Sequence, residues 1–365
     1  MPISNALTPP RVEHCIQSSL STPDEQAIVS SGRMRRASSL DVAKLAGVSQ
    51  SAVSRTFTPG AAVSNKTRAR VMKAAERLHY RPNALASSLI TKRSNMVALV
   101  IGDIENPFYA KIVNVFSVRL RSHGLHVLLF SLTGDDKVES ALEEVLKYRV
   151  DGVMLVSAIL SQQMADGCRR VGTPVVLYNR YAKGTTVSSV RVENYEGGRR
   201  AADFLVDAGH RRIAWIGGTR VDATSFDREN GFVGRLEERG VKPWKRVQGD
   251  YTFASGFDAA RKLLTPKQRP DAIFAVSDLM ALGFMEAARG EFGLRVPEDV
   301  SVVGFDDIPM ASWPSYELTT VRQPVEDMVD AALSLLIDQI ENPDQPPITR
   351  LLPGELQVRK SSRTP

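Results

Sequence analysis

Hydrophobic and polar positions in residues 38–57, SSLDVAKLAGVSQSAVSRTF, recur with the spacing of two short helices. Ser38 and Asp41 have the spacing of a capping box at the start of the first helix. Gly47 supplies a turn residue, and Ser49 can then cap the second helix. The apolar positions that share one face of the first helix are Val42, Leu45 and Ala46. The pattern therefore predicts a small helical hairpin.

The second helix of this hairpin has one apolar and one polar face. Its apolar side chains, which would pack on the first helix, are Ala52, Val53 and Phe57. The polar side chains at its start and on its other face are Ser49, Gln50, Ser51, Ser54 and Arg55. Because Gln can pair with an adenine edge and Arg with a guanine edge, this face suits a DNA major groove. The alternative is an ordinary helical hairpin with a polar outer face, since such short patterns are common.

A third helix is predicted over residues 65–79, with Ser64 as its cap. Its inward positions are Val71, Ala74, Ala75 and Leu78, and its outer side is basic through Lys66, Arg68, Arg70 and Lys73. The segment ALASSLI after Asn83 is too short to be stable alone, so it is either a helix that forms on DNA or a plain interdomain linker. Residues 1–37 lack periodicity and are predicted to be a disordered leader.

From Met96 onward, short apolar blocks alternate with segments of helical period. The blocks are MVALVI, HVLLF, GVMLV, VVLYN, IAWIG, AIFAV and SVVGF, each short enough for a buried parallel strand. Helices are predicted at 108–123, 136–148, 161–171, 195–208, 229–239, 255–264 and 278–292. This alternation predicts doubly wound α/β layers. A break near Val192 and a recrossing near residues 318–323 indicate two lobes with a cleft between them.

Charge is concentrated in one part of the chain. Residues 33–93 contain 13 Lys and Arg against two acidic residues, a net charge of +11, whereas residues 1–32 and 94–365 carry −2 and −3. A mildly acidic body with one strongly basic region of this size is the electrostatic pattern of a phosphate-binding domain. The alternative, a basic solvated surface, fits so concentrated an excess less well.

Motifs for enzyme chemistry, cofactors and metals are absent from the sequence. Neither a G-x-G-x-x-G motif opening a helix nor a G-x-x-x-x-G-K-[ST] motif occurs, and there is no G-x-S-x-G or H-E-x-x-H. The five histidines form no metal-ligand cluster, and Cys15 and Cys168 are too far apart for a disulfide framework or zinc site. The chain shows no signal peptide or membrane span, so we expect a cytoplasmic protein.

The sequence DVAKLAGVSQSAVSRTF, followed by VSNKTRARVMKAAERLHYRPNALASSL, resembles the DNA-binding region of the lactose-repressor (LacI/GalR) family. The resemblance implies that residues 50–57 form the recognition helix, with Gln50, Ser51 and Arg55 at base-reading positions. It also implies a hinge helix at residues 83–90, whose DNA-contacting residues are Asn83, Ala86 and Leu89. Leu89 matches the leucine that is wedged into the minor groove at the operator centre. Ala52, Thr56 and Phe57 depart from the family's usual residues, which affects the expected base preference but not the docking mode.

The resemblance continues through NPFYAKIV, GHRRIAWIGG, DRENGF, PDAIFAVSDLMALGFMEAA, VPEDVSVVGFDDIP and LTTVRQP. Such cores resemble periplasmic sugar-binding proteins, with a ligand between two lobes at the carboxyl ends of strands. Matching positions imply effector-binding roles for Asn106, Phe108, Asn179, Arg228, Tyr251, Ser277 and Asp306. Arg228 would hold hydroxyl or acidic groups, Asp306 would accept from hydroxyls, and Tyr251 would stack on the ligand. From spacing alone, Arg228 and Asp306 could instead form a lobe-to-lobe salt bridge, and Tyr251 and Phe108 could be core residues.

Together these features predict a DNA-binding transcriptional regulator, with a solute-binding protein or an α/β enzyme as the alternative. The expected parts are a leader (1–37), a helix-turn-helix domain (38–82), a hinge helix and linker (83–94), a two-lobed core (95–360) and a tail (361–365). The expected partners are double-stranded operator DNA, a second copy of the chain and a small effector such as a sugar or sugar derivative. No cofactor, metal or membrane partner is expected.

Overall fold

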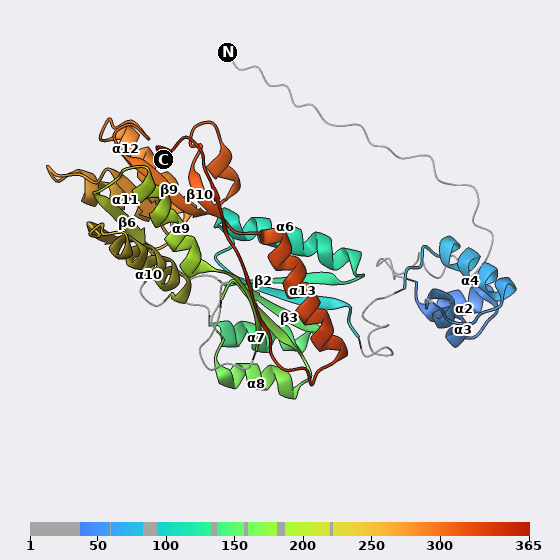
Figure 1. Ribbon diagram of the computed structural model, residues 1–365. Coiled ribbons are helices and arrows are strands. Elements are labelled where there is room, and N and C mark those ends of the chain that lie inside the picture. The colour runs from blue at the N-terminus through green and yellow to red at the C-terminus, as the bar shows by residue number, and fades with distance from the viewer. Residues whose placement is uncertain are drawn as a thin grey trace, which may run out of the picture. The chain divides into compact units, whose positions relative to one another are not determined.

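The computed structural model describes residues 37–58, 60–82, 93–132, 137–156, 160–180, 187–219 and 222–365. Its chain divides into two compact units, residues 1–90 and 91–365, which are described separately below (Figure 1). The described part of the first unit contains the helices α2 (Ser39–Ala46), α3 (Gln50–Phe57) and α4 (Asn65–Arg77). Both predicted end signals of the first helix are present. Ser38 and Asp41 form the capping box, and Gly47 ends α2 with a φ of 60°.

The core of the first unit is small and made largely of alanine and valine. Its buried side chains are Val42, Ala43, Ala46, Val53, Val71, Ala74 and Ala75. One expectation for the hairpin is wrong, because Leu45 is 44% exposed; Thr56, for which the pattern made no prediction, is buried. The reason is that α2 packs on both α3 and α4 through the face centred between Val42, Ala43 and Ala46. Successive residues of a helix are about 100° apart, which places Leu45 outside this buried face, on the side of Val42.

Within its described residues, the second unit contains two six-stranded sheets. The first has the order β11-β5-β4-β3-β1-β2, and the second β12-β10-β9-β8-β6-β7. The first sheet consists of β1 (Met96–Gly102), β2 (His126–Leu132), β3 (Gly152–Val156), β4 (Val175–Tyr178), β5 (Ser188–Val192) and β11 (Thr349–Leu352). The second consists of β6 (Ile213–Gly217), β7 (Lys245–Gln248), β8 (Ala272–Ala275), β9 (Ser301–Asp306), β10 (Thr319–Arg322) and β12 (Glu355–Gln357). Among the neighbouring strands of these two sheets, only β10 and β12 are antiparallel to each other.

Helices cover both faces of each sheet, so strands such as β3 are buried along their whole length. On the first sheet, α6 (Pro107–Ser122) and α13 (Val325–Glu341) cover one face, and α7 (Val138–Lys147) and α8 (Gln162–Arg170) cover the other (Figure 1). The second sheet is flanked by the pair α9 (Asn194–Asp207) and α10 (Ala223–Glu238) and the pair α11 (Phe253–Leu264) and α12 (Asp278–Gly290). A short 3-10 helix, η1 (Pro309–Ser312), follows β9. The predicted doubly wound architecture is confirmed.

Within the part of the chain that the structure describes, the backbone passes between the two sheets three times. It does so after β5 at Val192, after β10 at Arg322, and between β11 and β12 at residues 353–354. The third passage was not predicted. The carboxyl ends of β4 and β9, which carry Asn179 and Asp306, hold predicted site residues from each lobe.

Two boundaries differ from the predicted ones by more than two residues. Helix α10 begins at Ala223 rather than at residue 229, because Asp222 caps it by accepting a hydrogen bond from the Thr224 amide. The predicted tail is also wrong, since Ser361 and Ser362 are buried. The Ser361 hydroxyl donates to the Val302 carbonyl at 2.7 Å, so the core extends past residue 360.

Candidate functional site

The outer face of α3 presents the polar side chains that the sequence predicts for base reading. Gln50, Ser51, Ser54 and Arg55 are all exposed, whereas Val53 on the opposite face is fully buried. Ser49 caps the helix by accepting from the Ala52 amide at 3.3 Å. The Gln50 amide group donates to the Ser39 hydroxyl at 2.9 Å, an exposed contact that DNA could replace. The helix therefore offers amide, hydroxyl and guanidinium groups to an external partner.

Two basic residues of α4 hold the hairpin in place. Arg70 donates to the carbonyls of Ala46 and Gly47, at 2.5 and 2.8 Å, and so satisfies the carboxyl end of α2. Arg68 donates to the Thr56 carbonyl at 2.8 Å. These two side chains were predicted to be part of an outer basic face, but the structure gives each of them a bracing contact with a neighbouring helix.

The three other predicted DNA contacts, Asn83, Ala86 and Leu89, lie outside the described residues. Their roles as parts of a hinge helix therefore stay predictions.

In the second unit, the close approach of α9 and α10 sets the position of Arg228. A Cβ atom on Gly198 would lie 2.1 Å from the Arg228 carbonyl oxygen, and one on Gly231 would lie 1.9 Å from the Tyr195 carbonyl oxygen. Only glycine allows two helix backbones to come this close. Arg228 is consequently held against the end of the second sheet, where its guanidinium carbon lies 3.7 Å from the centre of the Phe305 ring.

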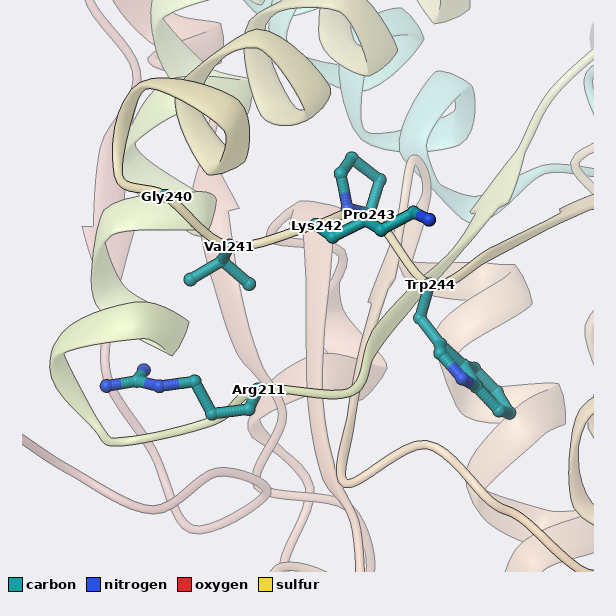
Figure 2. Close-up of a pocket in the computed structure, with 6 residues that line it drawn as sticks. All are labelled: Arg211, Gly240, Val241, Lys242, Pro243 and Trp244. Carbon is teal, nitrogen blue, oxygen red and sulfur yellow. The ribbon is translucent and has the colours of Figure 1, made fainter.

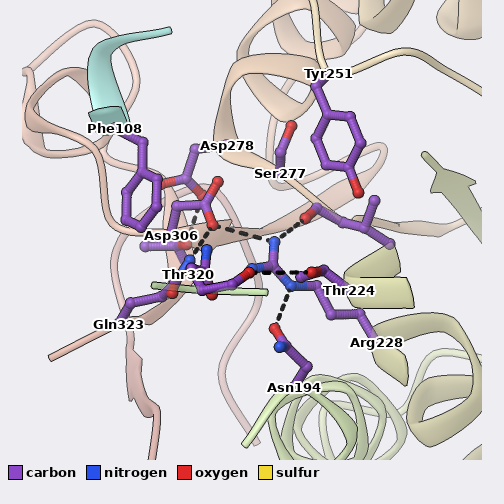
Figure 3. Close-up of polar contacts among 12 residues, drawn as sticks. Phe108, Asn194, Thr224, Arg228, Tyr251, Ser277, Asp278, Asp306, Thr320 and Gln323 are labelled. Carbon is purple, nitrogen blue, oxygen red and sulfur yellow. Dashed lines mark hydrogen bonds and ion pairs between the residues drawn. The ribbon is translucent and has the colours of Figure 1, made fainter. Parts of the chain in front are cut away.

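Arg228 is the centre of a buried polar cluster (Figure 3). It is 2% exposed and donates to the Asn194 side-chain oxygen at 2.8 Å and to the Val276 carbonyl at 2.6 Å. Its Nη1 also lies 3.1 Å from Oδ1 of Asp306, which in turn accepts from Gln323 at 2.6 Å. The predicted pairing of Arg228 with Asp306 therefore exists, but both residues belong to the lobe of the second sheet, so it is not a lobe-to-lobe bridge.

Two buried carboxyl groups lie at this end of the second sheet. Burial raises the pKa of Asp306, although the Arg228 guanidinium opposes the shift. Asp278 is fully buried, and burial together with the charge of Asp306 raises its pKa well above the usual range of a carboxyl group. Asp278 accepts from the Thr320 hydroxyl at 2.5 Å and from the Ile308 amide at 2.9 Å. The cluster thus combines a paired carboxylate with a carboxyl group that favours its neutral form.

Three predicted effector residues have left-handed backbone conformations at or just after strand ends. The φ angles of Asn179, Tyr251 and Asp306 are 57°, 70° and 120°. Non-glycine residues in this region are uncommon and tend to gather at functional sites, where packing maintains the strain. Each follows or ends a strand, respectively β4, β7 and β9. Their backbone geometry is a sign of a site that the sequence pattern alone did not reveal.

The remaining predicted residues have local structural contacts. Asn106 caps α6 by accepting from the Phe108 amide at 3.1 Å, and the Phe108 side chain is buried. Ser277 is fully buried and caps α12. Tyr251 donates its hydroxyl proton to Asp222, and burial raises its pKa well above the ordinary tyrosine range. Among the described residues, hydrogen bonds therefore join Arg228 to Asp306 directly, but do not join Asn106, Phe108 or Ser277 to that pair.

The sequence analysis missed several residues of the site, including Asp278, Thr320 and Arg180. Asn194 and Gln323 bind Arg228 and Asp306, and Asp222 and Thr224 contact Arg180 of the other lobe. Gln323 lies in LTTVRQP and Asn194 follows β5, so both stand at chain crossings. The predicted passage of the chain between the lobes, next to the predicted cleft, was the signal that could have identified Asn194 and Gln323.

Two surface hollows lie elsewhere on the second unit. One, of about 390 Å³, is lined by Arg211 and residues 240–244 and lies next to the amino ends of β6 and β7 (Figure 2). The other, of about 360 Å³, is lined by residues near the amino ends of β4 and β5 together with residues 343–347. Neither includes a predicted effector residue. Open α/β sheets bind ligands at the carboxyl ends of their strands, which favours the Arg228 cluster.

In the residues that the structure describes, no group of three or more His, Cys, Asp or Glu side chains could hold a metal ion. Within the same ranges, no helix is both long enough and apolar enough to cross a membrane.

Comparison with known proteins gives matches over both units. Residues 40–83 match the family model of bacterial regulatory proteins of the lacI family, and residues 202–362 match a periplasmic binding protein-like domain. The HTH-type transcriptional repressor PurR of Yersinia enterocolitica serotype O:8 / biotype 1B is 34% identical over 328 residues, covering 88% of this chain and 95% of the relative. PurR of Yersinia pestis strain Pestoides F matches to the same extent.

Solved structures give the same result. A lac repressor dimer bound to operator and the anti-inducer ONPF matches with a TM-score of 0.81 and 28% identity, covering 90% of this chain and 99% of that one. A complex of the transcriptional regulator CelR with cellobiose matches with a TM-score of 0.67 and 35% identity, covering 90% and 100%. The helical head and the two-sheet core define a DNA-binding transcriptional regulator with a periplasmic-binding-protein-like domain. The chain belongs to the lacI family of bacterial regulatory proteins and is a transcriptional repressor rather than an enzyme.

Proposed function

We propose that this repressor acts in the cytoplasm as a homodimer on a near-palindromic operator. In this proposal, α3 reads base edges in the major groove through Gln50, Ser51 and Arg55. The observation that carries it is the exposed polar face of α3 within a region of net charge +11. The dimer is supported by the similar lac repressor, which was solved as a dimer bound to operator. Two-fold symmetry would place the two α3 helices about one helical turn of DNA apart.

The proposed switch is a small polar effector, a sugar or sugar derivative, bound between the lobes of the second unit. The Arg228–Asp306 pair supports it, because a guanidinium donor beside a carboxylate acceptor suits hydroxyl groups that both donate and accept. Asn179 supplies a buried side-chain oxygen without a hydrogen-bond partner among the described residues. The related CelR binds a sugar, since it was solved with cellobiose. Coupling of about 1 to 3 kcal/mol between effector and operator would change operator affinity several-fold to a hundredfold.

Footprinting tests the DNA-binding part of the proposal. The full chain should protect two symmetrical half-sites selectively, and this protection should weaken steeply as salt rises because phosphate contacts release counterions. The Arg55→Ala variant should lose about 1 to 3 kcal/mol of discrimination at one base pair in each half-site. A matched control is Glu144→Gln, on the exposed face of α7 in the second unit, which should leave the footprint unchanged. Protein that protects no sequence selectively contradicts the proposal.

Thermal-shift measurements on the full chain test the effector part. Sugars, sugar acids and nucleobases would each be added at increasing concentration, because a ligand bound to the folded protein stabilises it by mass action. A stabilising ligand whose effect is lost in Asn179→Ala, but kept in a variant of the hollow near Trp244, supports binding between the lobes. The opposite pattern would place the ligand in that hollow.

A further inference from the structure

A group of four side chains connects the two lobes of the second unit. Arg180 follows β4 of the first sheet, whereas Asp222 and Thr224 stand at the start of α10 and Tyr251 follows β7, beside the second sheet. We infer that these four residues form a clasp that holds the two lobes together in the absence of effector. The inference deepens the proposed function, on which it rests for its regulatory consequence.

The contacts of the clasp are short and converge on one carboxylate. Arg180 Nη1 lies 3.3 Å from Oδ1 of Asp222 and donates to the Thr224 hydroxyl at 2.5 Å. The other oxygen of Asp222 accepts from the Tyr251 hydroxyl. The Thr224 hydroxyl also lies 3.4 Å from the Asn179 carbonyl, which adds a second contact between the lobes.

The burial of this ion pair separates it from ordinary surface pairs. The side chains of Arg180 and Asp222 are 14% and 7% exposed. Exposed ion pairs contribute little to stability because water screens them, whereas separating a largely buried pair leaves two charges that must be rehydrated or paired anew. The clasp can therefore form a favourable interaction in one lobe arrangement and lose it in another, which is the property that biases a conformational equilibrium.

The location of the clasp also suits this role. The chain crosses between the lobes at β5, β10 and β11, and β4 is not one of the crossing strands. A contact made from β4 therefore depends on the lobe arrangement and is not imposed by a covalent connection. Next to Arg180, the Asn179 side chain is 2% exposed, and its oxygen has no hydrogen-bond partner within the described ranges. An effector hydroxyl donating to this oxygen would add to the clasp and strengthen the same arrangement.

Hydrogen exchange of the full chain, measured without effector, tests the clasp. For each variant, the amide exchange rate is compared with wild type in the lobe that does not carry the substitution. Asp222→Asn keeps the helix cap, since Asn caps as well as Asp, but removes the charge. It should raise the exchange rate several-fold in residues 175–180. Arg180→Gln should do the same in residues 222–228. In the double variant, the exchange rates of these segments should be only slightly higher than in the single variants, because both changes remove the same contact. Residues 272–275 of the buried strand β8 serve as the internal reference for folding.

The control is Arg199→Gln, which removes the 2.7 Å pair with Glu238 inside one lobe and should leave both segments unchanged. Unchanged exchange in the clasp variants, or effects that simply add in the double variant, would overturn the inference. Operator affinity measured on the same proteins separates the clasp from the proposed function. If exchange rises while operator affinity stays constant, the clasp stands and its regulatory coupling fails. If wild-type protein binds no operator selectively, the proposed function fails whatever the exchange shows.

Discussion

The outer face of α3 and the cluster around Arg228 are two polar sites built in opposite ways. The side chains of this outer face are exposed, belong to one helix of eight residues and make few contacts with the rest of the protein. Arg228 is buried, and its partners come from α9, the end of β8 and β9, while Asp306 also accepts from the segment after β10. The first site depends on local sequence, and the second depends on the assembly of a whole lobe.

This difference determines what a substitution does to each site. An exposed side chain can be exchanged with little effect on folding, so the outer face of α3 can change without loss of stability. A buried cation or carboxyl group cannot be removed without leaving its partner unsatisfied. Under the proposed function, changes of effector specificity in the second unit would therefore need compensating changes, whereas changes of operator specificity would not.

The largest expected effect is that of Arg228→Ala. The substitution leaves the buried Asp306 without its cation, and removing one partner of a buried ion pair costs about 3 to 5 kcal/mol. Urea unfolding followed by tryptophan fluorescence measures this loss in the second unit, because Trp215, Trp244 and Trp313 all lie there.

The matched control in the first unit is Arg55→Ala, which should change the free energy of unfolding of either unit by less than about 0.5 kcal/mol. The double variant Arg228→Ala with Asp306→Ala should recover part of the loss, since it removes the uncompensated charge. Equal effects of Arg228→Ala and Arg55→Ala would contradict the distinction between the two sites.

A smaller effect is expected from Asp278→Asn, and it depends on pH. Because the folded-state pKa of Asp278 is raised, its proton is bound more tightly in the folded protein than in the unfolded chain. The resulting stability is fully present below the unfolded pKa of about 3.9 and is lost as pH rises toward the folded pKa. Asn stays neutral at every pH, so the free energy of unfolding of the variant should change less than that of the wild type as pH rises above 4. Unfolding curves from about pH 4 to 8 provide the measurement.

An exposed carboxylate of the same unit should show the opposite sign. Hydrogen bonds from Arg199 and Arg235 lower the pKa of Glu238 to about 2. The stability from Glu238 is therefore present above its ordinary unfolded pKa and is lost as pH falls toward 2. Relative to wild type, Glu238→Gln should be destabilised at neutral pH, with the difference vanishing in acid. Parallel pH profiles for the Asp278 and Glu238 variants would be inconsistent with these environments.

Local patterns predicted the structure well wherever one element determines the outcome. The capping box of α2, the exposed polar face of α3 and the inward positions of α4 follow from helical spacing. The α/β alternation is also visible in the sequence, since buried parallel strands are continuous apolar runs. By contrast, α13 was not predicted, although Val325–Glu341 carries buried positions at helical spacing. Nor was the early start of α10 at Ala223, directly after its cap Asp222.

The cluster around Arg228 was predictable only in part. Arg228 and Asp306 were found through the family resemblance, and the structure shows that they touch. Asn194 and Gln323 were missed because a contact across several elements leaves no periodic signal in the sequence. Their importance follows from the crossings between lobes, which become visible only when the strand order is known.

The smallest expected change in stability is within the first unit, where a helix-capping serine is compared with an exposed serine. Ser38→Ala removes the hydroxyl that accepts from the Asp41 amide at 3.3 Å and donates to the Asp41 carboxylate at 2.6 Å. Loss of such a cap costs about 1 kcal/mol. Ser54→Ala, on the exposed face of α3, should instead be neutral or stabilise by a few tenths of a kcal/mol, because Ala is the better helix former. Hydrogen exchange in residues 39–57 would measure both effects, and tryptophan emission should not change. Destabilisation of α2 by both variants alike would show that the exposed face of α3 also supports the fold, and the contrast between the two sites would then be lost.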